Sequence, residues 1–166
     1  TYSMPPFRLA SRGVGEAAVA TAFGVLPVTG AAWLQTGTLS PGAALVSLAV
    51  AAWVANILLM NEGPDIRADA AAGKRTLAVR LGARPTRRLQ IALHAAAAGV
   101  SVLGVAAGIL HALAPLVPAA IAIAAPYMTR GALTPERPAA VLPAITFTMV
   151  AHGAGTLWLA AAVLLA

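Results

Sequence analysis

Long apolar stretches recur along the whole chain, and they constrain its fold more than any other feature. A bilayer core about 30 Å thick is crossed by about 20 helical residues, so each stretch is a candidate membrane-spanning helix. Polar residues, prolines and glycines divide the sequence into five such helices. We expect them at about residues 15–35, 41–60, 89–110, 113–129 and 139–165. The sequence therefore predicts an all-α, polytopic transmembrane helical bundle.

The composition also favours a lipid environment. Hydrophobic residues make up 60% of the 166 and charged residues 10%, which is too little polar material to cover a water-soluble globule. The net charge of +6 would suggest nucleic acid for a soluble domain, but here few aromatic residues accompany the basic ones. Anionic headgroups or a phosphorylated substrate are better partners. The absence of cysteine excludes disulfides, iron–sulfur clusters and thiolate nucleophiles.

The basic residues fall only in alternate connections between the expected spans. With five spans these connections lie on one side of the membrane, which the positive-inside rule identifies as cytoplasmic. We expect a bacterial or archaeal cell membrane, with the carboxyl terminus outside. The eleven bases are Arg8, Arg12, Arg67, Lys74, Arg75, Arg80, Arg84, Arg87, Arg88, Arg130 and Arg137.

One segment carries most of the acidic residues. NEGPDIRADAAAGKRTLAVRLG, residues 61–82, contains three of the five in the chain. Pro64 suits the first position of a new helical turn, which puts Asp65 and Asp69 four residues apart on one helical face. Adjacent carboxylates repel each other without a cation, and Mg²⁺ binds one or two carboxylates together with phosphate oxygens. The spacing favours a metal–phosphate site.

Neighbouring polar residues can extend this site. Asn61 and Glu62 lie one turn earlier and can complete the metal shell, while Lys74 and Arg75 can neutralise phosphate oxygens. The alternative is an ordinary cytoplasmic loop at 61–88, in which the carboxylates pair with basic side chains of the same loop. Spacing by itself does not separate the two interpretations.

The pattern NE-PD--AD--AGKRTLAVRLG resembles the second aspartate-rich motif of the UbiA superfamily of intramembrane aromatic prenyltransferases. The opening YSMPPFRLASRGVGE, followed by a helix ending in LQTG, is similar to the segment before the fifth helix in the branch that prenylates dihydroxynaphthoate for menaquinone synthesis. Both motifs occur in the family's order. The resemblance covers essentially the whole chain, which would form the carboxyl-terminal five of the family's nine helices.

The resemblance implies a specific reaction. Family members bind an isoprenyl diphosphate through Mg²⁺, ionise its allylic C–O bond, and let an aromatic ring such as a dihydroxynaphthoate or hydroxybenzoate attack the carbocation. The metal ligands implied here are Asp65, Asp69 and Glu62, and the catalytic residues are Asp65, Asp69 and Lys74. The diphosphate contacts implied are Asn61, Lys74, Arg75, Tyr2 and Arg8.

Two features of the matching sequence concern the role of Arg12 and Glu16 and the completeness of the motif set. Arg12 and Glu16 lie in the matching opening, where they either border the substrates or, being four residues apart, form a structural ion pair. The family's first aspartate-rich motif, NDxxDxxxD, does not occur in the 166 residues. We therefore expect a single membrane domain, 1–166, that is the carboxyl-terminal portion of a longer protein, the opening at Thr1 being an internal loop. A processed mature start is the alternative.

Other functions fit less well. Transporters place ionisable groups near the bilayer midplane, whereas here only His152 is expected deep in a span, so a transporter subunit or a non-catalytic membrane protein is the alternative. A lipid phosphotransferase of the CDP-alcohol type would need a glycine-rich aspartate signature that is absent. The histidines show no metal-ligand spacing and are expected to be packed or hydrogen-bonded. Tryptophans near the expected span ends, Trp33, Trp53 and Trp158, are expected to be interfacial anchors.

Overall fold

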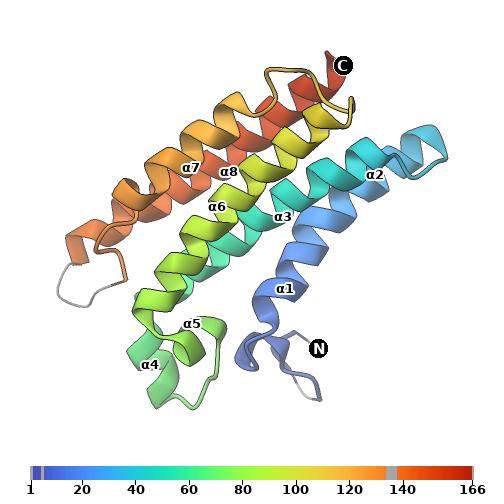
Figure 1. Cartoon of the computed structure of the whole chain (residues 1–166). Helices are drawn as coiled ribbons and strands as arrows, with labels where there is room; N and C mark the ends of the chain where they lie inside the picture. Colours follow the sequence, from blue (N-terminus) through green and yellow to red (C-terminus); the bar gives the residue numbers. More distant parts are fainter. Residues whose placement is uncertain (1, 5, 134–137, 166) are drawn as a thin grey trace.

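The computed structural model describes residues 2–4, 6–133 and 138–165, and over these residues it is helical without strands (Figure 1). Four described helices are long and apolar enough to cross a membrane: Gly15–Thr36, α3 (Pro41–Glu62), α6 (Ala83–Ala106) and α8 (Val141–Leu164). The expected polytopic bundle is confirmed, and the protein is an integral membrane protein. Short helices α4 (Ile66–Ala71) and α5 (Leu77–Leu81) connect α3 to α6.

The expected span at 113–129 is a shorter helix, α7 (Leu116–Met128), of 13 residues. At 1.5 Å per residue it is about 20 Å long, less than the bilayer core. It packs against α6 and α8. The Arg87 guanidinium of α6 donates to the carbonyl of Pro126 at 2.6 Å, which satisfies one of the free carbonyls at the end of α7.

The first membrane helix is continuous but not uniform. It consists of α1 (Gly15–Ala20), a π-helical stretch η2 (Thr21–Val25) and α2 (Leu26–Thr36). Pro27 follows the π-helical stretch, and because proline has no N–H it interrupts the regular helical hydrogen bonds there. Only 11% of the apolar window of this helix is buried, so few of its side chains are covered by the described bundle.

The first helix crosses α3 at Gly24. A Cβ atom added there would overlap the backbone of Ala51, whereas Gly30, in the same helix, has nothing within 4 Å. We expect Gly24→Ala to lower the free energy of unfolding by about 1–3 kcal/mol, because the helices must separate. Gly30→Ala is the matched control and should be neutral or slightly stabilising. Thermal unfolding of the purified variants in detergent would measure this, and equal melting temperatures would contradict the crossing.

Helix α3 forms the centre of the bundle, packed against the first helix, α6 and α8. Trp53 is fully buried, with its ring against Gly155 of α8, where a Cβ would overlap the indole. The expectation that Trp53 is an interfacial anchor is therefore wrong. Trp33 is 51% exposed, and Trp158 donates to the Leu113 carbonyl at 3.2 Å.

The histidines take structural positions. His94 is buried in α6 with its ring 5.6 Å from that of Phe147, and His111 Nδ1 accepts from the Leu113 amide at 3.3 Å. His152 is half-buried in α8, and its Nδ1 has no partner among the described residues. The packed or hydrogen-bonded state expected is confirmed for His94 and His111.

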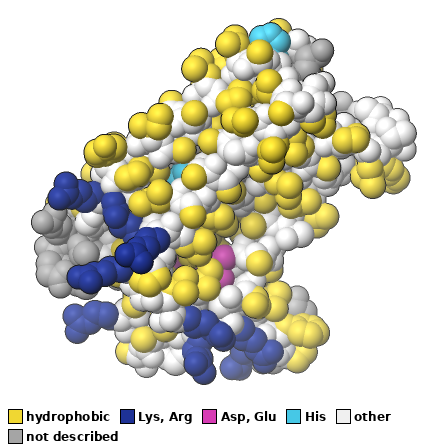
Figure 2. Space-filling view, viewed as in Figure 1, with side chains coloured by type: hydrophobic (Ala, Val, Ile, Leu, Met, Phe, Trp, Pro, Cys, Tyr) yellow, Lys and Arg dark blue, Asp and Glu magenta, His cyan; other side chains and the backbone are white. Residues whose placement is uncertain are grey.

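The charged side chains gather at one end of the bundle (Figure 2). The amino-terminal segment, α4, α5 and the start of α6 lie at this end, and the α2–α3 connection and the carboxyl terminus lie at the other (Figure 1). Because α6 begins at Ala83 and not at the expected 89, Arg84, Arg87 and Arg88 belong to its first turns. Arg137 lies outside the described residues.

Candidate active site

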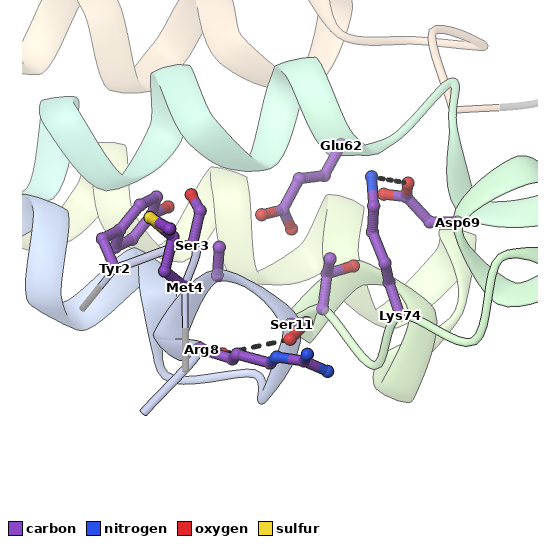
Figure 3. A pocket seen from close by; sticks show the side chains of 10 residues that line it. Tyr2, Ser3, Met4, Arg8, Ser11, Glu62, Asp69 and Lys74 are labelled. Carbon is purple, nitrogen blue, oxygen red and sulfur yellow. Dashed lines mark hydrogen bonds and ion pairs between the residues drawn. The ribbon is translucent and has the colours of Figure 1, made fainter. Parts of the chain in front are cut away.

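A pocket of about 490 Å³ opens at the charged end of the bundle. It lies between the amino-terminal segment, the end of α3 and the residues that follow α4 (Figure 3). Its wall contains both carboxylates and cations. The lining residues are Tyr2, Ser3, Met4, Arg8, Ala10, Ser11, Glu62, Asp69, Lys74 and Thr76.

A short connection between α3 and α4 brings the acidic segment to this pocket. Helix α3 ends at Glu62, Asp65 takes the N-cap position of α4, and the Asp69 amide donates to the Asp65 carbonyl at 2.8 Å. The two aspartates therefore share a helical face, as their spacing predicts. Asp65 is exposed, while the side chain of Asp69 is 13% exposed and lines the pocket.

Residues 72–76, which we call the Lys74 loop, follow α4. Gly73 has φ +74°, a conformation that glycine adopts without strain, and the Lys74 amide then donates to the Asp69 carbonyl at 2.9 Å. The Lys74 ammonium forms an ion pair with Asp69 Oδ1 at 2.7 Å. This hydrogen bond to Asp69 raises the pKa of Lys74, so the side chain keeps its positive charge.

The Lys74 loop and the residue that follows it are also bonded to the amino-terminal part of the chain. The Arg75 amide donates to the Ser11 carbonyl at 3.1 Å, and the Leu77 amide donates to Glu16 Oε1 at 2.9 Å. Gly13 packs against the Arg75 carbonyl and the Arg80 side chain. Segments about sixty residues apart thus meet at one pocket.

Two carboxyl groups, those of Glu62 and Glu16, lie close together at the pocket. Glu62 extends from α3 into it (Figure 3), and its Oε2 is buried without a partner in the described residues. The Glu16 carboxylate interacts electrostatically with Glu62, and its own Oε2 is likewise unpartnered. Partial burial, followed by the charges of Glu62 and Glu16, raises the pKa of the Tyr2 phenol. A cation would relieve the repulsion between these carboxylates.

The structure brings together five of the eight site residues expected from the sequence: Tyr2, Arg8, Glu62, Asp69 and Lys74. The other three, Asn61, Asp65 and Arg75, are exposed and do not line the pocket. Arg8 has φ +46° and is the one described non-glycine residue with positive φ. Its carbonyl accepts from the Ser11 hydroxyl at 3.1 Å.

The ion pair considered between Arg12 and Glu16 does not form. The Arg12 guanidinium donates instead to the Pro6 carbonyl at 3.3 Å, and Glu16 accepts from Leu77. Sequence reasoning missed the contribution of Ser11 and Thr76 to the pocket. Their hydroxyl side chains carry no spacing signal in the sequence.

An apolar groove of about 430 Å³ runs between the first helix, α3 and α6. Aliphatic side chains line nearly all of it, and Glu16 is its one charged lining residue in the described part of the chain. Because Glu16 also accepts a hydrogen bond from Leu77, the residue directly after the Lys74 loop, the groove begins beside the charged pocket. The lining includes Ala20, Leu48, Ala55, Leu59, Leu93 and Val100.

The chain matches the UbiA prenyltransferase family over residues 1–149. It is 37% identical over 83 residues to 1,4-dihydroxy-2-naphthoate octaprenyltransferase of Haemophilus influenzae, covering 50% of this chain and 27% of that protein. It is 36% identical over 84 residues to 2-carboxy-1,4-naphthoquinone phytyltransferase of Synechocystis, covering 51% and 27%. The chain thus spans about a quarter of the length of these curated relatives. No solved structure matches it significantly.

Proposed function

The chain belongs to the UbiA prenyltransferase family, and on this premise we propose that it forms the carboxyl-terminal part of a membrane enzyme that transfers a polyprenyl group from an isoprenyl diphosphate to an aromatic acceptor. One observation carries the proposal: two segments distant in sequence meet at a single pocket lined by Lys74, Arg8, Asp69 and Glu62. Cations recognise a diphosphate, and carboxylates recognise the metal that accompanies it.

The residues present fit a Mg²⁺ ion shared with substrate. Glu62 has a buried, unpartnered carboxylate oxygen, Asp69 lines the same pocket, and Asp65 lies one turn away. A Mg²⁺ ion bound together with a diphosphate needs only one or two protein carboxylates, because phosphate oxygens supply further ligands. When bound, Mg²⁺ would stabilise the charge that develops on the departing diphosphate.

Other residues of the chain would bind the diphosphate and the prenyl tail. Lys74 and Arg8 place positive charge on the diphosphate, with the Tyr2 phenol in the same pocket. The apolar groove holds the prenyl tail and keeps water from the carbocation. The similarity to a dihydroxynaphthoate octaprenyltransferase and a carboxynaphthoquinone phytyltransferase supports a naphthoate-type acceptor, and a hydroxybenzoate is the second candidate.

Further carboxylates of the metal site would come from residues outside the 166, since the first aspartate-rich motif is not among them. The proposal is tested with membranes that contain the complete protein, supplied with an isoprenyl diphosphate and dihydroxynaphthoate. We expect a prenylated product by mass spectrometry that disappears when Mg²⁺ is chelated. Absence of product from every hydroxylated aromatic acid tried would contradict it.

We also propose that the charged end faces the cytoplasm, because basic residues cluster there. The chain has no cysteine, so single cysteines can be introduced without background. In intact cells, Thr38→Cys and Ala112→Cys, at the opposite end, should react with a membrane-impermeant maleimide, whereas Arg84→Cys should react only after lysis. The reverse pattern would contradict this orientation.

A further inference from the structure

We propose that Glu16 is a positioning residue that holds the Lys74 loop in place, and so sets the affinity of the pocket for the diphosphate. The inference rests on the proposed function for the identity of the ligand. The contact itself is structural: Glu16 Oε1 accepts a hydrogen bond from the Leu77 amide at 2.9 Å, across 61 residues of sequence. Glu16 is 4% exposed, so water does not compete for this bond.

The hydrogen bond between Leu77 and Glu16 lies at the end of the Lys74 loop, where the loop meets α5. Leu77 is the first residue of α5, directly after Thr76, whose hydroxyl accepts from the Val79 amide at 3.3 Å. Without Glu16 the Leu77 amide would lose its partner at a half-buried position, which is costly. The loop would then be held to the amino-terminal segment mainly by the bond between the Arg75 amide and the Ser11 carbonyl.

The position of the Lys74 ammonium depends on the hydrogen bond between Leu77 and Glu16. Its ion pair with Asp69 connects the loop to α4, and both sides of the loop must be fixed for the cation to face the pocket. Glu16 also lines the start of the apolar groove. Glu16 therefore contacts both the segment that positions the Lys74 ammonium and the groove proposed for the prenyl tail.

The role assigned to Glu16 is that of a hydrogen-bond acceptor and not of a charge. Its second oxygen is buried, and its carboxyl group interacts with that of Glu62 and with no basic side chain of the described residues. A glutamine has the same length and keeps the accepting oxygen, so Glu16→Gln should preserve the attachment. Glu16→Leu keeps the approximate volume but removes the acceptor.

The donor can be deleted independently. Leu77→Pro removes the amide proton, and proline is tolerated at the first position of a helix. Thr76, the preceding residue, has φ −57° and ψ 165°, which is compatible with a following proline. If the two groups act through one bond, combining Glu16→Leu with Leu77→Pro should do no more damage than either change alone.

The test uses the complete protein in detergent and in membranes. Trypsin cleaves after Lys74 and Arg75, so the rate of cleavage there reports opening of the loop. We expect Glu16→Leu and Leu77→Pro to be cleaved about tenfold faster than wild type, from the loss of one hydrogen bond. The KM for prenyl diphosphate should rise by a similar factor with a smaller change in kcat, and Glu16→Gln should match wild type in both measurements.

The outcomes separate this inference from the proposed function. Unchanged cleavage in Glu16→Leu, or a Glu16→Gln variant as damaged as Glu16→Leu, would overturn the positioning role. If Glu16→Leu does not fold, Leu77→Pro decides in its place. If wild type transfers no prenyl group but the cleavage pattern is as expected, the proposed function fails and the attachment of the loop stands.

Discussion

Replacing Asp69 with asparagine should reduce prenyl transfer by about a hundredfold or more while leaving expression and membrane insertion unchanged. Asp69 is the carboxylate of α4 that lines the pocket, and it forms the ion pair with Lys74. The substitution removes a metal ligand and the partner that orients Lys74, but it changes neither the size of the side chain nor the apolar core. Initial rates of product formation in membranes would measure the effect.

Two other variants of α4 and its N-cap serve as comparisons for Asp69→Asn. Arg67→Gln changes an exposed charge on the same short helix and should leave the rate within about twofold. Asp65→Asn, at the exposed N-cap of α4, should also lower the rate strongly if the metal extends to it, as the family resemblance implies. If the Asp69→Asn enzyme had wild-type activity, the proposed role of the motif in metal binding would be contradicted.

Replacing Trp53 with alanine should lower the free energy of unfolding by about 3–5 kcal/mol, the largest stability effect that we expect. The indole is fully buried in α3 against Gly155 of α8, so truncation leaves a cavity between the two helices. Thermal unfolding of the purified protein in one fixed detergent would measure it.

Trp33 provides the matched control, because it lies in a membrane helix but is 51% exposed. Trp33→Ala should change the melting temperature little. Equal destabilisation by the two variants would mean that α3 and α8 do not pack as described.

The helices were largely predictable from the sequence because long apolar runs and their glycine and proline boundaries are local signals. Ser40 and Pro41 begin α3 and Gly37 ends α2, as such residues commonly do. The start of α6 was missed because its first turns are basic, and hydropathy places charged residues outside a span. Arg87 in these turns donates to the Pro126 carbonyl of α7, a contact that hydropathy does not indicate.

Only the part of the site that depends on residues close together in the sequence could be predicted. Asp65 and Asp69 share a helical face as expected, but burial distinguishes them, and burial depends on packing against the amino-terminal segment. The bond from Leu77 to Glu16 joins residues far apart in the chain, so no periodicity indicates it. Trp53 was misassigned for the same reason: its partner is Gly155, in another helix.

The most direct test of the central claim is the structure of the complete protein with Mg²⁺ and an unreactive prenyl thiodiphosphate. We expect the diphosphate to lie in contact with Lys74 and Arg8, with the metal between its oxygens and the carboxylates of Asp69 and Glu62, and the prenyl tail to follow the groove beside Leu93. A diphosphate bound away from the pocket between the amino-terminal segment and the Lys74 loop would contradict the account.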